Sequence, residues 1–111
     1  MKGEMTMNLT MLSGTMGPLN ESNVFVRGDG ATVVDSYIFK TYQKSEKVFD
    51  SHFYFTIAGS KADKLLKHFK EGDRAMVTGK LATRVDDDGH YWVVIVASNI
   101  TKMDNNIETD F

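Results

Sequence analysis

The sequence from residue 50 to residue 84 reads DSHFYFTIAGSKADKLLKHFKEGDRAMVTGKLATR and holds two strand patterns around one helix pattern. We expect a strand over residues 50–57, a helix over residues 61–70 and a second strand over residues 74–84, with a turn at Gly72. An aromatic-rich strand that leads through one short helix into another strand is typical of a small β-barrel. The rest of the chain is therefore interpreted as strands that complete this barrel.

Both the first strand and the helix in this stretch have one apolar face. In the strand, alternating apolar residues are predicted to point into the core: Phe53, Phe55 and Ile57. In the helix, apolar residues follow the spacing i, i+3, i+4, i+7: Ala62, Leu65, Leu66 and Phe69. Ser60 is the expected N-cap, and Asp63 is the acidic half of a capping box. The apolar helix face predicts that the helix closes one end of the barrel.

The flanking sequence supplies three more strand patterns. Alternating apolar residues predict a strand over residues 7–13, and β-branched and aromatic residues predict one over residues 32–41. An apolar run predicts the last strand over residues 90–101. Between the first two strands, residues 19–31 are interpreted as a long loop or a small hairpin.

Turns and bends separate these strands. The polar, mostly basic residues 42–49 predict a loop that reaches toward a ligand, and Asp88-Gly89 predicts a hairpin turn at residues 86–89. Gly79 predicts a bulge or a bend in its strand.

Five strands with one helix between the third and fourth is the order of an oligonucleotide-binding fold, which is an all-β barrel. A chain of 111 residues with 41% hydrophobic residues supports one modest core. We expect this domain to occupy residues 1–103. Residues 104–111 have few apolar side chains and are predicted to form a short, acidic, disordered tail.

Composition excludes several kinds of chemistry. The absence of cysteine removes disulfides, thiolate catalysis and cysteine-ligated zinc, and the three histidines are too widely spaced to predict a metal site. With no nucleophile and base pair or phosphate loop in the sequence, we predict neither an enzyme nor a cofactor. No apolar run approaches the roughly 18 residues of a membrane helix. We expect a cytoplasmic protein that does not span a membrane.

Aromatic residues on the outward strand faces predict nucleic-acid binding. Tyr37 and Phe39 share the outward face of one strand, and Tyr54 lies on the corresponding face of the next. Trp92 has two readings, as a core residue or as a stacking residue. The cations expected beside these rings are Lys40, Lys80 and Arg84. Unpaired bases stack on aromatic rings, and cations neutralise phosphates without reading sequence.

Residues 65–84, from Leu65 through Gly72 to Gly79-Lys80-Leu81 and Arg84, resemble the helix-to-strand segment of bacterial and phage single-stranded DNA-binding proteins. The resemblance spans most of residues 7–103. It implies an oligonucleotide-binding fold that coats single-stranded DNA in replication or recombination, independent of sequence. It also implies a homo-oligomer, dimer or tetramer, with pairing along the edge of the first strand.

The resemblance also implies particular binding positions. The stacking positions of that family fall near Lys44, His52, Ala58 and Val85, and only His52 carries a ring. This departure suggests that stacking has moved to the outward rings of the neighbouring strands: Tyr37, Phe39, Tyr54 or Trp92.

The end of the chain resembles the acidic, hydrophobic-tipped tail with which that family recruits replication or recombination proteins. The residues that carry this likeness are Ile107, Asp110 and Phe111, while a frayed terminus that ends in Phe is the other reading. The small size and short tail suggest a phage protein. The weak net charge of −2 supports an alternative function, a barrel of the primosome type that binds other replication proteins.

Overall fold

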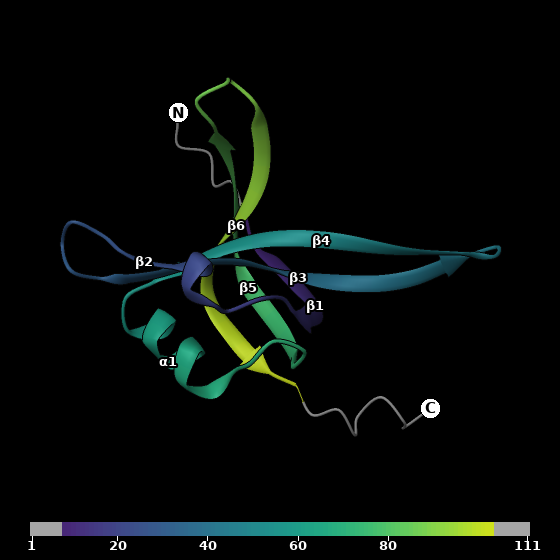
Figure 1. Cartoon of the computed structure of the whole chain (residues 1–111), viewed down its shortest axis with the longest axis horizontal. Helices are drawn as coiled ribbons and strands as arrows, with labels where there is room; N and C mark the ends of the chain where they lie inside the picture. The colour runs from purple at the N-terminus through teal and green to yellow at the C-terminus, as the bar shows by residue number, and fades with distance from the viewer. Residues whose placement is uncertain (1–7, 104–111) are drawn as a thin grey trace.

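The computed structural model describes residues 8–103 as a mostly β structure with the α-helix α1 (Figure 1). The elements are β1 (Thr10–Met16), the 3₁₀ helix η1 (Glu21–Asn23), β2 (Val24–Val26), β3 (Thr32–Lys44), β4 (Lys47–Ala58), α1 (Ser60–His68), β5 (Arg74–Val85) and β6 (Tyr91–Lys102). The start of the predicted first strand at residue 7, the tail and its residues Ile107, Asp110 and Phe111 lie outside the described residues.

Five strands form a closed barrel in the order β1-β5-β6-β4-β3, and β3 pairs back onto β1. The closing contact consists of the pairs Thr15↔Phe39 and Met16↔Ile38. All pairings are antiparallel except β4–β6, which is parallel. The helix α1 lies between β4 and β5, the third and fourth strands of the barrel. This confirms the predicted all-β, five-stranded oligonucleotide-binding barrel, to which β2 adds a short strand along the edge of β3.

The core follows the predicted apolar faces. Its buried residues come from all five barrel strands and from α1: Met16, Val34, Ile38, Phe55, Ile57, Ala62, Leu65, Ala75, Val77 and Ile95. Among residues 8–103, Ser36 is also buried, and its hydroxyl donates a hydrogen bond to the carbonyl of Pro18 at 2.6 Å. This bond satisfies the hydroxyl inside the barrel. No helix within residues 8–103 has the length and apolar character needed to span a membrane.

Two glycines allow strands to approach closely. The prediction that the first strand ends before Gly14 is wrong, because β1 runs on to Met16. A Cβ atom at Gly14 would lie 2.7 Å from the carbonyl oxygen of Phe39, so glycine permits the contact between β1 and β3 that closes the barrel. The predicted irregularity at Gly79 is confirmed by a register shift between Thr78 and Gly79.

The helix begins and ends differently from the prediction. Gly59, with φ of 76°, is the N-cap residue, and no side chain caps the helix, so the capping box of Ser60 and Asp63 is wrong. The helix ends at His68 rather than at residue 70. Gly72, with φ of 99°, makes the predicted turn into β5.

The predicted loop over residues 42–49 is also wrong. β3 continues to Lys44 and β4 resumes at Lys47, so that only Ser45 and Glu46 form the turn, with Ser45 at a φ of 59°. The β3–β4 hairpin therefore extends well beyond the barrel. Figure 1 shows that the β3–β4 and β5–β6 hairpins leave the barrel in different directions. Of the two alternatives predicted for residues 19–31, a long loop or a small hairpin, the structure shows a small hairpin, which β2 forms with the start of β3.

Candidate nucleic-acid interface

Four rings cluster on the outer face of β3 and β4. They belong to two neighbouring cross-strand pairs, Tyr37↔Tyr54 and Phe39↔His52. The Tyr37 and His52 rings stack with centroids 4.4 Å apart, and Tyr54 meets the edge of Tyr37 at 5.7 Å. Phe39 contacts His52 at 6.1 Å in an edge arrangement. We call these four residues the ring surface.

The ring surface is only partly exposed. The two rings on β3 were expected to be exposed, but Tyr37 and Phe39 are half-buried because they pack against each other and against His52. Tyr54 keeps 46% of its surface exposed. The packing fixes the orientation of the rings, and the two rings on β4, His52 and Tyr54, are exposed to a ligand.

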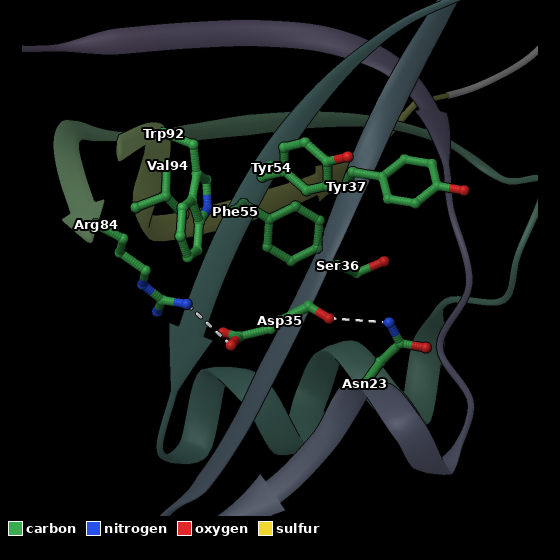
Figure 2. Close-up of a pocket in the computed structure, with 9 residues that line it drawn as sticks. All are labelled: Asn23, Asp35, Ser36, Tyr37, Tyr54, Phe55, Arg84, Trp92 and Val94. Atoms are coloured by element: carbon green, nitrogen blue, oxygen red, sulfur yellow. Dashed lines mark hydrogen bonds and ion pairs between the residues drawn. The ribbon is translucent and has the colours of Figure 1, made fainter. Parts of the chain in front are cut away.

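A pocket of about 530 Å³ lies between the ring surface and the β5–β6 hairpin. Tyr37 and Tyr54 line it from β3 and β4, and Trp92 and Arg84 line it from β6 and β5, as Figure 2 shows. Arg84 and Trp92 are a cross-strand pair, so both side chains lie on the same face of their hairpin. Trp92 is 38% exposed and lies outside the core, so it lines the pocket and is no core residue.

An ion pair crosses the floor of this pocket. Arg84 Nη1 donates to Asp35 Oδ2 at 3.0 Å, and the carbonyl of Asp35 accepts a hydrogen bond from Asn23 Nδ2 at 3.0 Å (Figure 2). The side chains of Arg84 and Asp35 keep 38% and 36% of their surfaces exposed. Asp35 Oδ1 is buried and has no hydrogen-bond partner among the described residues. Asp35 thus neutralises Arg84, one of the cations predicted to contact phosphates.

The other predicted cations lie outside the pocket. Lys80 is exposed and pairs with Val96 across the β5–β6 hairpin. It shares the outer face of β5 with Arg84, four positions further along the strand. Lys40 and Lys44 are exposed on the opposite face of β3 from Tyr37 and Phe39. The structure therefore brings together six of the predicted site residues: Tyr37, Phe39, His52, Tyr54, Arg84 and Trp92.

Sequence reasoning missed two features of this region. Asp35 is not among the predicted site residues, because its partner Arg84 is distant in the chain. Tyr42 and Phe49 were assigned to a loop, although they form a stacked cross-strand pair with centroids 5.5 Å apart. Apolar alternation does not continue past residue 41, so the sequence carries no strand signal for this pair beyond the two rings themselves.

Within residues 8–103, acidic and histidine side chains that could hold a cation gather at the β5–β6 turn. Ligand atoms of Asp86, Asp88 and His90 lie within 4.8 Å of one another, and all three residues are exposed. The Asp86 carboxylate accepts the backbone N–H groups of Asp88 and His90 at 3.0 and 2.8 Å. These bonds account for the cluster as a turn structure.

No protein-family model matches the chain, and a search of curated proteins finds no match to it either.

Proposed function

We propose that the protein binds single-stranded DNA without sequence preference. The observation that carries this proposal is the ring surface beside an open pocket of about 530 Å³ that has Trp92 on its far wall. Every base has a π face, and stacking on an aromatic side chain is worth roughly 1 to 3 kcal/mol per base. Rings offered by β3, β4 and β6 suit a single strand whose bases are unpaired, whereas a duplex keeps its bases stacked inside.

The charge pattern makes stacking the larger contribution. Asp35 already pairs with Arg84, which leaves Lys80 as the exposed cation on the same outer face. Each phosphate neutralised contributes about −0.7 to the slope of log affinity against log salt for a single strand. Few free cations predict a shallow slope. We therefore expect the affinity for single-stranded DNA to fall only moderately as the salt concentration rises.

The test is binding of labelled oligo-dT by fluorescence anisotropy, together with quenching of Trp92. Tyr54→Ala removes an exposed ring of the ring surface and is expected to lower affinity by roughly 5- to 100-fold, the equivalent of one stacking contact. Tyr91→Ala is the matched control, because Tyr91 precedes Trp92 on the opposite face of β6 and is 73% exposed. It should leave affinity unchanged. Absence of binding at low salt, or equal affinity for a duplex, would contradict the proposal.

This proposal extends to the biological setting that the sequence resemblance implies. The protein would coat strands of a phage genome that are exposed during replication or recombination, as a dimer or tetramer. Ile107, Asp110 and Phe111 would then recruit replication or recombination proteins. The observations that support this extension are the barrel and the motif residues 65–84.

One observation favours a second candidate function, a barrel whose main partners are proteins. The face of the β5–β6 hairpin that continues the barrel interior carries exposed apolar side chains beyond the core: Leu81, Val85, Tyr91 and Val93. Exposed apolar surface of this kind is typical of protein contact sites. This candidate predicts no oligo-dT binding at low salt, which separates it from the first.

A further inference from the structure

The far half of the β3–β4 hairpin has a second surface, on the opposite side from the ring surface. Residues 41–50 are all exposed, because this part of the hairpin projects beyond the barrel. In a strand, alternate side chains point to opposite faces, and cross-strand partners share a face. The pairs Tyr42↔Phe49 and Lys44↔Lys47, together with Lys40, therefore lie on one face. We call these five residues the tip face.

The tip face holds two exposed rings that no core covers. Tyr42 and Phe49 stack with centroids 5.5 Å apart and an angle of 24° between their planes. Tyr42 is 52% exposed and Phe49 is 40% exposed, so both rings keep accessible surface. A stacked pair of this kind can be extended by a further flat ring such as a nucleobase.

The charges of the tip face are of one sign. Lys44 and Lys47 are direct cross-strand partners, and like charges at such positions are destabilising. Within residues 8–103, the ion pairs that form do not involve these lysines or Lys40. Asp50 points to the other face, where its carboxylate accepts a hydrogen bond from the Thr41 hydroxyl at 2.7 Å. An anionic ligand would relieve this repulsion.

Two hollows flank the stacked rings. One, at the end of the hairpin, is lined by Lys44, Lys47 and Phe49 together with the turn residues Ser45 and Glu46. The other, of about 350 Å³, lies where β1 meets β3 and includes Lys40 and Arg74 in its lining. Basic side chains therefore lie on both sides of the ring stack along the hairpin.

We infer that the tip face is a second contact site for single-stranded nucleic acid, where a base stacks on Tyr42 or Phe49 and phosphates contact Lys44 and Lys47. This inference rests on the proposed function. A strand that occupies the ring surface passes the edge of the hairpin and continues onto the tip face. One nucleic-acid strand thus contacts both faces of the hairpin. Only a strand that is long enough to reach around the edge fills the second site.

The test compares a short and a long oligo-dT, of about 5 and about 15 nucleotides, which span the usual range of site sizes for one such barrel. The double variant Tyr42→Ala/Phe49→Ala should bind the short strand as the unaltered protein does and the long strand roughly 5- to 100-fold more weakly. Lys44→Ala/Lys47→Ala should reduce the salt slope for the long strand by about 1.4, the value for two phosphates.

The matched control is Gln43→Ala/Val48→Ala, a cross-strand pair at the same level of the hairpin but on its other face. This control variant should bind the short and the long oligo-dT as tightly as the unaltered protein does. All variants alter exposed residues, so unchanged thermal unfolding midpoints will confirm that the hairpin and barrel are intact. Equal affinity of the ring variant and the unaltered protein for the long strand would overturn the inference, as would equal losses at both lengths. Failure of the unaltered protein to bind either strand would instead contradict the proposed function itself.

Discussion

Asp35 is the carboxylate among the residues that line the pocket beside the ring surface. Its negative charge repels phosphate. Its carboxylate also holds the Arg84 side chain in an ion pair, with 3.0 Å between Arg84 Nη1 and Asp35 Oδ2. A partly exposed ion pair of this kind contributes only about 0 to 1 kcal/mol to stability. Its larger effect is therefore on the electrostatic potential that a nucleic acid meets in the pocket.

We predict that Asp35→Asn strengthens oligo-dT binding. The substitution removes the repulsive charge and frees the Arg84 guanidinium for a phosphate, so the salt slope should become steeper by about 0.7. Anisotropy titrations at several salt concentrations measure both effects. Asp50→Asn is the control, since Asp50 is an exposed acid of the same hairpin that lies outside the pocket. Weaker binding by Asp35→Asn would show that the ion pair positions Arg84 for the ligand.

At the scale of elements, Asp73 joins the turn after α1 to two strands of the barrel, β1 and β6. Its carboxylate accepts the backbone N–H of Lys70 at 3.0 Å and lies 3.4 Å from Lys102 Nζ on β6. Its backbone carbonyl accepts the N–H of Met16 at 2.7 Å, at the end of β1. The hydrogen bond from Lys70, followed by the interaction with Lys102, lowers the pKa of Asp73 below its ordinary value of 3.8.

This lowered pKa predicts a defined acid sensitivity. Because the folded protein holds the carboxylate ionised more strongly than the unfolded chain does, the stabilisation is complete above pH 3.8 and is lost as the pH falls through the lower folded pKa. Asp73→Asn should therefore be less stable than the unaltered protein at neutral pH, and the difference should shrink at acidic pH. Urea unfolding at a series of pH values measures this. A difference that stays constant with pH would contradict the assignment.

The sequence predicts those strands and helices whose apolar residues recur at a regular spacing because that face is buried in the core. Phe55, Ile57 and Leu65 were placed correctly because each belongs to a stripe that a barrel must bury. The ends of the β3–β4 hairpin were not predicted, since a two-stranded ribbon packed on nothing needs no apolar alternation and looks like a polar loop. The N-cap was predicted at Ser60 because serine is a common capping residue. The N-cap is instead Gly59, whose positive φ the sequence pattern does not reveal.

The candidate site was predicted in part for a similar reason. Tyr37 and Tyr54 follow from strand alternation on adjacent strands, which sequence reveals. Their relation to Trp92 and Arg84 depends on the path of a second hairpin that starts after α1, and no local pattern encodes that path. The pairing of Asp35 with Arg84, which changes the charge of the pocket, depends on the same three-dimensional arrangement.

At the scale of the whole molecule, the strand pairing within the two long hairpins is much longer than the β4–β6 and β1–β3 pairings that close the barrel. β3–β4 and β5–β6 pair over most of their lengths, whereas β4–β6 and β1–β3 are joined by two residue pairs each. Backbone hydrogen bonds covered by a second layer open rarely, and those in a projecting ribbon open often.

Hydrogen exchange should therefore vary along a single hairpin. We predict slow exchange for β3 amides over residues 33–38, which lie beside the core, and fast exchange over residues 41–44, which share the same partner strand but are all exposed. Mass spectrometry of overlapping peptides resolves the two segments. Uniform protection along β3 would contradict this prediction.

The short β4–β6 and β1–β3 pairings also bear on the order in which the protein folds. Each hairpin joins segments that are adjacent in the chain, and such hairpins form in roughly 1 to 10 μs. The parallel contact of Phe55 and Thr56 with Ile95 and Val96 must instead bring together strands separated by α1, β5 and a turn, at a larger cost in loop-closure entropy and for few hydrogen bonds. We therefore predict that closure of the barrel is the late and slow step of folding and limits the folding rate of the chain.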